Sequence, residues 1–297
     1  MSPQEAGIAF RDHAITARDV TKRYGEVKAL DGVGFAVPTG SAIALWGPNG
    51  AGKTTVLRCL LGLARYSGEI RVAGYDPLRD GRAVRETIGY VPQDLPISPM
   101  TVGEFTAFIA SLKRAPLKGA IERLDLLGIG DQTDKHVGAL SGGMKQRLAL
   151  ALALIGTPKI LLLDEPTANL DAHGRAELLE LLRGLRQDGL TLVFSSHRAE
   201  DVVALADRVL MIEAGVLKSN VSPSCFQQQL GATSRLTVIL KNGHLPQALA
   251  TIDRLGFVAT GEGHVVTVPL PLQEKARVIG ALACEGIEIV DFDVERI

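Results

Sequence analysis

One stretch early in the chain has the residue types and the spacing of a loop that binds phosphate. It satisfies the pattern G-x-x-x-x-G-K-[ST] and consists of Gly47, Pro48, Asn49, Gly50, Ala51, Gly52, Lys53, Thr54 and Thr55. Its glycines let the backbone wrap closely around phosphate oxygens, so that successive N–H groups point at the anion. We expect Lys53 to reach the β- and γ-phosphates and the Thr54 hydroxyl to hold a Mg²⁺ ion. The stretch therefore predicts a site for the phosphates of a nucleotide.

Two adjacent carboxylates supply groups that could act on such a nucleotide. Asp164 and Glu165 follow the apolar run 160–163, which predicts a central parallel strand covered on both faces. Asp164 can complete the Mg²⁺ shell with Thr54. Glu165 then points toward the γ-phosphate, where it can orient and deprotonate water. A pair of acids that merely ends a strand is the weaker interpretation, given the loop upstream.

Two further polar residues follow predicted strands. Gln93 follows the strand expected at 88–92, and His197 follows the strand expected at 190–194. The end of a strand that opens onto a loop is where an α/β sheet presents groups to its ligand. Gln93 is placed to touch Mg²⁺ or the attacking water, and His197 could hold the γ-phosphate or a water molecule. Taken alone, each would be an ordinary polar residue at the end of a strand.

A second predicted helix start can bind an anion. In the segment 140–147, Ser141 suits the N-cap position, and Gly142 and Gly143 leave the amides of the first turn open. This pattern alone indicates only a well-capped buried helix. Together with a phosphate loop far upstream, it suggests that a nucleotide is held between two protein surfaces.

The elements around these residues have to position them. The strand expected at 42–46 enters the phosphate loop and the helix expected at 55–63 leaves it, with the positive end of the helix dipole toward the anion. The strands expected at 14–20 and 33–37 should form an antiparallel flank. The segment 21–25 is expected to be a turn that carries Tyr24, whose ring could stack on a purine or fill the core.

The middle of the chain, about 94–157, loses the strand pattern and is predicted to be a helical subdomain. Thr101 and Glu104 have the spacing of a capping box, so a helix should begin there. A second helix is expected at 120–127. Insertions of this kind usually carry contacts to partners.

Composition restricts the classes of protein to consider. The chain has 297 residues, of which 46% are hydrophobic and 22% are charged, and its net charge is −1, so no overall field attracts nucleic acid. The three cysteines are far apart in the sequence, which argues against a disulfide framework or a zinc cluster and fits a reducing compartment. We see no apolar run of the roughly 18 to 20 residues that cross a bilayer and no secretory signal. Action at a membrane would require another polypeptide.

The sequence pattern after residue 232 predicts a strand–helix–strand–strand–helix–strand order, which is the ferredoxin-like arrangement. Its elements are expected at 235–240, 245–255, 257–260, 265–268, 273–284 and 287–294. The domain organisation predicted for the chain is a flexible tail at 1–13, a main domain at 14–220, a linker at 221–232 and an accessory domain at 233–297. His244, His264 and Cys284 do not form a ligand cluster, and ordinary placement is the better interpretation.

Residues 14–218 together resemble the ATP-binding subunits of ABC transporters. The resemblance rests on the phosphate loop, Gln93, the segments 140–147, 160–166 and 169–172, and His197, in that order. It implies an α/β P-loop NTPase core of the ABC ATPase type, with an antiparallel β flank and a helical subdomain, beside the small α+β domain. It also implies that Tyr24 stacks on adenine, that Glu165 is the general base, and that Ser141 and Gly143 contact the γ-phosphate bound to the opposite subunit.

Two chains would then form a head-to-tail dimer around two ATP molecules with Mg²⁺, with Asp171 in the contact between them. Met144 and Asn169 depart from the commonest pattern, and neither departure removes a phosphate ligand. The segment 144–147 looks more like exporters whose ATPase and membrane subunits are separate chains. We therefore expect an ATPase that works peripherally at the cytoplasmic face of the membrane with an integral membrane permease, as a homodimer or paired with another ATPase subunit.

Two alternatives remain open at this point. A soluble ABC ATPase that acts on ribosomes or DNA would usually need two ATPase halves or a long coiled coil, and the sequence shows neither. A small-molecule kinase could use the same phosphate loop, but segment 140–147 and His197 argue against it. The transported cargo cannot be read from the sequence, because it would contact the membrane chain.

Overall fold

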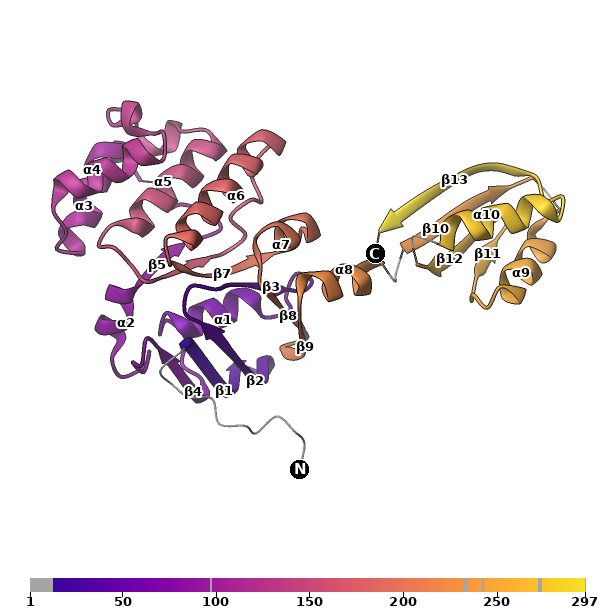
Figure 1. Cartoon of the computed structure of the whole chain (residues 1–297), viewed down its shortest axis with the longest axis horizontal. Coiled ribbons are helices and arrows are strands. Elements are labelled where there is room, and N and C mark those ends of the chain that lie inside the picture. Colours follow the sequence, from indigo (N-terminus) through magenta and orange to yellow (C-terminus); the bar gives the residue numbers. More distant parts are fainter. Residues whose placement is uncertain (1–12, 97, 232–233, 242, 272–273, 297) are drawn as a thin grey trace. The chain divides into compact units, whose positions relative to one another are not determined.

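The structure, a computed structural model, describes residues 13–296 except 97, 232–233, 242 and 272–273 (Figure 1). The chain divides into two compact units, of which one ends at Pro223 and the other begins at Ser224. Of the tail expected at 1–13, only His13 lies within the described residues, and it begins a strand.

The first unit is built on a mixed six-stranded sheet. Its strand order is β5-β6-β7-β3-β8-β9, and all neighbours are parallel except the antiparallel pair of β8 and β9. The strand bounds are β3 Ala42–Trp46, β5 Ile88–Val91, β6 Ile160–Leu163, β7 Thr191–Ser196, β8 Arg208–Glu213 and β9 Val216–Val221. Every residue of β6 is buried, as its apolar run predicts. Because β3, β5, β6 and β7 are parallel, their carboxyl ends share one edge of the sheet.

A second, antiparallel sheet flanks the core, with the order β2-β1-β4. Its strands are β1 His13–Tyr24, β2 Val27–Pro38 and β4 Ser67–Val72. The prediction of a turn at 21–25 was wrong, because β1 continues through Tyr24, which pairs with Val27. The chain reverses instead at Gly25, whose φ of 57° is available to glycine at little steric cost.

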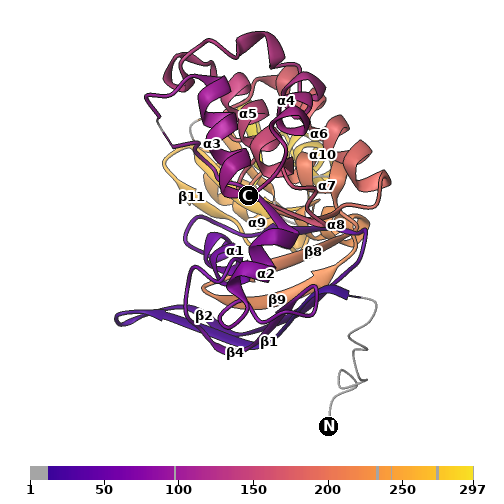
Figure 2. The same ribbon diagram turned by 90° about the vertical axis from the view of Figure 1, so that its left-hand side faces the viewer.

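The helices of the first unit include a group contributed by the middle of the chain. The bounds are α1 Lys53–Leu60, α2 Gly81–Thr87, α3 Val102–Leu112, α4 Leu117–Leu126, α5 Gly142–Leu154, α6 Ala172–Gln187 and α7 Ala199–Leu205, with short 3₁₀ turns at Gly130–Gln132 and Val137–Ala139. Figure 2 shows α3, α4 and α5 gathered away from the flanking sheet.

The start of α3 confirms the predicted capping box. The Thr101 hydroxyl accepts from the Glu104 backbone, and the Glu104 carboxylate accepts from the Thr101 backbone. Lys113 caps the C-terminal end of this helix, and its Nζ donates to the carbonyl oxygens of Leu152, Ala153 and Ile155 at the end of α5, at 3.4, 3.1 and 2.9 Å. This lysine therefore ties the end of α3 to the end of α5.

The second unit has the predicted ferredoxin-like order. After α8 Pro223–Gly231 come β10 Ser234–Leu240, α9 Leu245–Arg254, β11 Thr260–Glu262, β12 Val265–Leu270, α10 Lys275–Cys284 and β13 Ile289–Arg296. Its antiparallel sheet has the order β11-β12-β10-β13. The strand expected at 257–260 begins only at Thr260, and the backbone N–H of Phe257 instead donates to the Ile252 carbonyl oxygen near the end of α9. Gln273, expected to begin a helix, lies outside the described residues.

Candidate functional site

The phosphate loop connects β3 to α1, as predicted. Two of its glycines are held against the backbone of neighbouring segments. A Cβ atom on Gly52 would lie 2.7 Å from the Ala29 carbonyl oxygen, and one on Gly47 would lie 2.1 Å from the Ile212 carbonyl oxygen. Gly52 also has a φ of 110°, which residues with a side chain rarely adopt. These positions need glycine for packing as well as for access to phosphate.

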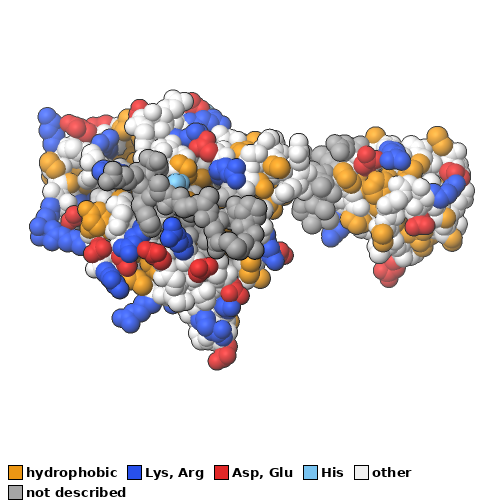
Figure 3. Space-filling view, turned by 60° about the horizontal axis from the view of Figure 1, so that its bottom comes forward, with side chains coloured by type: hydrophobic (Ala, Val, Ile, Leu, Met, Phe, Trp, Pro, Cys, Tyr) orange, Lys and Arg blue, Asp and Glu red, His pale blue; other side chains and the backbone are white. Residues whose placement is uncertain are grey.

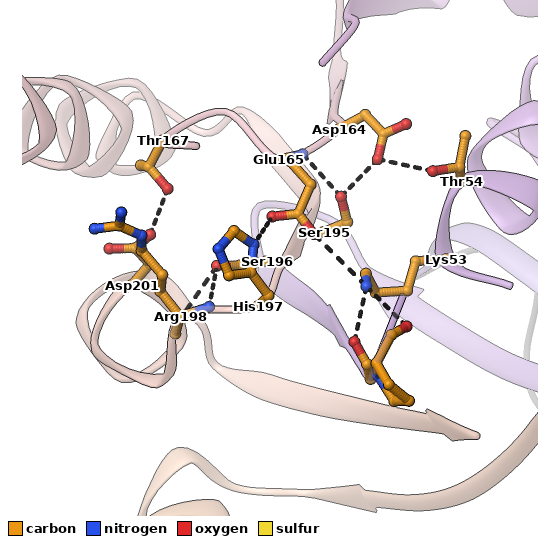
Figure 4. A network of polar contacts seen from close by, with 12 residues as sticks. Lys53, Thr54, Asp164, Glu165, Thr167, Ser195, Ser196, His197, Arg198 and Asp201 are labelled. Atoms are coloured by element: carbon orange, nitrogen blue, oxygen red, sulfur yellow. Dashed lines mark hydrogen bonds and ion pairs between the residues drawn. The ribbon is translucent and has the colours of Figure 1, made fainter. Parts of the chain in front are cut away.

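Lys53 begins α1 and lies at the base of the loop, with 7% of its surface exposed. Its Nζ donates to the carbonyl oxygens of Gly47 and Pro48, at 2.7 and 3.3 Å. The same atom lies 3.6 Å from Oε1 of Glu165. The lysine thus joins the phosphate loop to the carboxylate that follows β6 (Figure 4).

Asp164 and Thr54 lie together, as the sequence predicts. The Thr54 hydroxyl donates to Oδ1 of Asp164 at 3.1 Å, and the Ser195 hydroxyl donates to the same oxygen at 2.7 Å. Asp164 is buried, with 3% of its surface exposed. Burial raises the pKa of the nearby Tyr90 hydroxyl, and the negative charge of Asp164 raises it further, so Tyr90 stays neutral beside this acid.

Glu165 and His197 form the second contact of the site. Nδ1 of His197 lies 2.7 Å from Oε2 of Glu165. The backbone of Glu165 has a φ of 49°, in the left-handed region, and its side chain is buried. His197 comes from the loop after β7 and Glu165 from the end of β6, so two neighbouring parallel strands bring them together.

These groups border a cavity of about 750 Å³. Predicted residues in its wall are Asn49, Gly50, Ala51, Gly52, Lys53, Thr54, Thr55, Gln93, Glu165 and His197. Sequence reasoning missed the other residues in the wall, which are Val27, Lys28, Ala29, Ala168 and Ala214. These residues belong to β2, to the turn after Glu165 and to the turn between β8 and β9. Most have small or apolar side chains, so their types gave no sign that these distant segments meet at the cavity. Gln93 thus lies in the wall with the phosphate loop.

Tyr24 lies beside this wall without forming part of it. It pairs with Val27 at the end of the hairpin, and 45% of its surface is exposed. Nζ of Lys22 lies 4.5 Å from the centre of the Tyr24 ring, which is a cation–π contact. The structure therefore places Tyr24 next to Val27 and Lys28 of the wall, with its ring in contact with a lysine of its own strand.

Ser141, Gly142 and Gly143 are not brought to this cavity. Ser141 caps α5, and its hydroxyl accepts from the Met144 backbone at 3.3 Å. Gly143 lines a different cavity of about 300 Å³, together with Leu170 and Gly174. Asp171 caps α6 and accepts from the Gly174 backbone at 2.8 Å. The second predicted anion site and the phosphate loop are therefore separate within one chain.

The residues that the structure describes contain neither a membrane-spanning helix nor a cluster of metal ligands. None of their helices is both long and apolar enough to cross a bilayer. Within the same residues, no three His, Cys, Asp or Glu side chains lie together as they would around a metal ion. Basic and acidic side chains lie interspersed on the surface seen in Figure 3, in keeping with the net charge of −1.

Known proteins resemble this chain over most of its length. The ABC transporter family matches residues 30–168. A daunorubicin resistance ATP-binding protein of Streptomyces coeruleorubidus is 35% identical over 96% of this chain and 93% of its own. Nod factor export ATP-binding protein I of Burkholderia orbicola is 40% identical over 68% of each chain. An ATP-binding cassette solved as a post-hydrolysis dimer bound to ADP and Pi is 28% identical, with a TM-score of 0.65 over 70% of this chain and 98% of its own.

Proposed function

We propose that this chain, which belongs to the family of ATP-binding subunits of ABC transporters, drives export by closing with a second copy around two Mg-ATP molecules. The family assignment makes it an ATPase of a transport system. The observation that carries the proposal is the contact of Lys53, Glu165 and His197 at the wall of one cavity. Export is supported by the resemblance to a Nod factor export protein.

Mg²⁺ fits the groups that lie beside the phosphate loop. Thr54 and Asp164 offer a hydroxyl and a carboxylate oxygen, which are the hard ligands that this ion prefers, and they already contact one another. These two residues would hold the ion together with phosphate oxygens, and Gln93 would contribute from the wall of the cavity. When bound, Mg²⁺ neutralises negative charge on the phosphates.

The protein's own side chains have distinct roles in hydrolysis. Lys53 would transfer its donors from the loop carbonyls to phosphate oxygens. Glu165 would accept the proton of the attacking water, because its carboxylate lies in the wall and is held by two basic groups. His197 would orient the Glu165 carboxylate and place its second ring nitrogen toward the cavity. Tyr24 would receive the adenine ring at the end of the hairpin.

A second copy would complete the nucleotide site. Within one chain, Ser141 caps the start of α5, and Ser141 and Gly143 are absent from the wall of the cavity that contains the phosphate loop. A helix start with two glycines can approach a phosphate without hindrance from side chains. We propose that Ser141, Gly142 and Gly143 of one chain contact the γ-phosphate bound to the other, with Asp171 between them. The dimeric cassette bound to ADP and Pi supports this arrangement.

The membrane subunit is proposed to dock on the helical segment at the side of Gln93. Five large apolar side chains of α3 and α4 are exposed, namely Phe108, Leu112, Leu117, Ile121 and Leu126. Exposed apolar side chains gathered on adjacent elements are typical of a contact surface. The partner would be an apolar segment of an integral membrane permease, which would hold this chain at the cytoplasmic face of the membrane.

Replacement of Glu165 by Gln tests the base and the dimer together. The variant E165Q should bind ATP and accumulate as a dimer, as measured by light scattering. Its rate of phosphate release should fall by about 100-fold or more. E200Q changes an exposed glutamate at the start of α7 and should behave as wild type. Hydrolysis at the wild-type rate by E165Q would overturn the assignment of the base. Full activity of a strictly monomeric protein, independent of its concentration, would overturn the shared site.

The direction of transport needs the membrane chain. Copurification with an integral membrane protein, and ATP-dependent cargo movement in vesicles of known orientation, should show movement away from the ATPase side. Movement toward that side would contradict export. Copurification with ribosomes or DNA would favour the alternative of a soluble ATPase.

A further inference from the structure

Ser195 is a fully buried hydroxyl that lies between the two carboxylate residues of the site. It is the fifth residue of β7, Thr191–Ser196, and none of its surface is exposed. Its Oγ donates to Oδ1 of Asp164 at 2.7 Å and accepts from the Glu165 backbone N–H at 2.8 Å. Figure 4 shows this hydroxyl between the end of β6 and Thr54.

Ser195 and His197 reach the same neighbours from the end of β7. Successive side chains of a strand point to opposite faces, so Ser195 and Ser196 lie on opposite sides of β7, and His197 directly follows the strand. The pairing of Leu163 with Phe194 places the next residue, Ser195, beside Asp164. Ser196 faces the other way, and among the described residues its hydroxyl bonds to the backbone N–H and carbonyl oxygen of Arg198 and to neither acid. Ser195 at the end of β7 therefore contacts Asp164 and the Glu165 backbone, and His197 just after the strand contacts the Glu165 carboxylate.

The polarity of the two hydrogen bonds of Ser195 is fixed. A carboxylate only accepts and a backbone N–H only donates, whereas a hydroxyl carries one hydrogen and two lone pairs. The hydroxyl must therefore give its hydrogen to Asp164 and accept from Glu165. Its removal would leave a buried N–H without an acceptor at a residue whose φ of 49° is sterically unfavourable.

We propose that Ser195 is a positioning residue that holds the Mg²⁺ ligand Asp164 and the backbone of the base Glu165 in register for hydrolysis. This inference rests on the roles proposed above for Asp164 and Glu165. Ser195 does not touch the cavity, so its effect passes through these two residues. Its loss should lower the turnover rate and the affinity for the metal, while the phosphate loop continues to bind ATP.

The test compares S195A and S195C with S195T and S196A. Alanine removes the hydroxyl, cysteine keeps similar shape with a weak donor and acceptor, and threonine restores the hydroxyl on a side chain suited to a strand. S196A removes a neighbouring buried hydroxyl that contacts neither acid. We expect kcat to fall about 10- to 100-fold in S195A and S195C, with KM for ATP changed less than about threefold. S195T should recover most of the rate, and S196A should match wild type.

Two binding measurements separate positioning from general damage. Trp46 is the single tryptophan of the chain and directly precedes the phosphate loop, so its fluorescence can report ATP binding in EDTA. That affinity should be the same in all variants. Mn²⁺ binding to the ATP-loaded protein, measured by electron paramagnetic resonance, should be several-fold weaker in S195A and S195C.

Wild-type kcat and Mn²⁺ affinity in S195A and S195C would overturn the proposal. An equal loss of kcat in S196A would also overturn it. If S195C lost metal-free ATP binding as well as hydrolysis, the hydroxyl of Ser195 would have a merely structural role, and the proposal would again be wrong. Failure of the proposed function is a separate result, because it would appear as normal hydrolysis by E165Q. An inactive E165Q beside a normal S195A would reject the role of Ser195 alone.

Discussion

The hydroxyl of Thr167 donates a hydrogen bond to Oδ2 of Asp201, 34 residues further along the chain. Asp201 lies in α7, four residues after His197, and only 1% of its surface is exposed. Nε of Arg175, from α6, lies 3.6 Å from its other carboxylate oxygen. The segment after Glu165, helix α6 and the helix after His197 therefore meet at one buried acid.

Removal of that acid should destabilise the first unit. We expect D201A to lower the free energy of unfolding by about 2 to 3 kcal/mol, because Thr167 and Arg175 lose their buried partner. A double-mutant cycle with T167V should give a coupling energy of about 1 kcal/mol. Urea denaturation measures both, with E180A as a control at an exposed ion pair. A loss in D201A no larger than in E180A would contradict a structural role for the contact.

His197 should affect hydrolysis far more than binding. In H197A the Glu165 carboxylate loses its 2.7 Å partner while Lys53 and the phosphate loop are unchanged. Phosphate release should fall about 100-fold or more, with the Kd for ATP within about threefold of wild type. H264A removes an exposed histidine of the second unit and serves as the control. Unimpaired turnover in H197A would show that Glu165 needs no such partner.

Stability should decline at alkaline pH because of Cys59. Burial raises the pKa of this thiol from 9.0 to about 11, while the charge of Lys22 lowers it by a smaller amount. The folded protein keeps the thiol proton where the unfolded chain releases it, so this contribution is complete below pH 9 and is lost as the pH rises toward 11. We expect a loss of about 2 to 3 kcal/mol over that interval.

The comparison with C59A isolates this effect. The variant should be less stable at pH 8, and its free energy of unfolding should fall less steeply between pH 9 and 11, as measured by urea denaturation. Parallel curves for the two proteins would exclude Cys59 as the cause. At pH 8, a thiol reagent should modify Cys225 and Cys284, which are exposed, and leave Cys59 unreacted until the protein unfolds.

The capping box of α3 predicts a modest and local loss. T101A removes the acceptor of the Glu104 backbone N–H and should lower the free energy of unfolding by about 1 kcal/mol. S111A, at an exposed position in the last turn of the same helix, should change it by less than about 0.5 kcal/mol. Urea denaturation of the two variants gives the comparison. Equal effects would mean that the cap contributes nothing measurable.

The second unit should fold without the first. Its core consists of its own residues, among them Leu236, Val238, Ile252, Val268 and Leu282. A protein that ends at Pro223 should therefore retain ATP binding, and a protein of residues 224–297 should unfold cooperatively on heating. Circular dichroism measures the second outcome. A sloping, non-cooperative transition would show that the accessory domain depends on the rest of the chain.

Short sequence patterns predicted the features that depend on neighbouring residues in the chain. The apolar run 160–163 indicated a buried strand, Thr101 and Glu104 indicated a helix start, and the order of elements after Ser234 indicated the ferredoxin-like arrangement. The sequence also predicted that the phosphate loop, Asp164, Glu165 and His197 lie close together. Each follows a predicted strand, and parallel strands end at one edge of a sheet.

The remaining features depend on contacts between distant segments. The extension of β1 to Tyr24 follows from pairing with β2, and Val27, Lys28 and Ala29 enter the cavity wall because of that pairing. Ser195 could have been noticed from its type and its spacing of two from His197. Its bonds to Asp164 and Glu165 arise only when β6 and β7 lie side by side, which no single stretch of sequence specifies.

Lys113 links the end of α3 to the end of α5 by side-chain hydrogen bonds. Its three hydrogen bonds to the last carbonyls of α5 join the two helices at one end, and the other end of α5 is the serine–glycine start at residues 141–143. The 13 residues of α5 form a rod of about 20 Å. A membrane subunit bound on α3 would therefore be linked through Lys113 to the same helix whose opposite end is proposed to meet the neighbouring chain's phosphate.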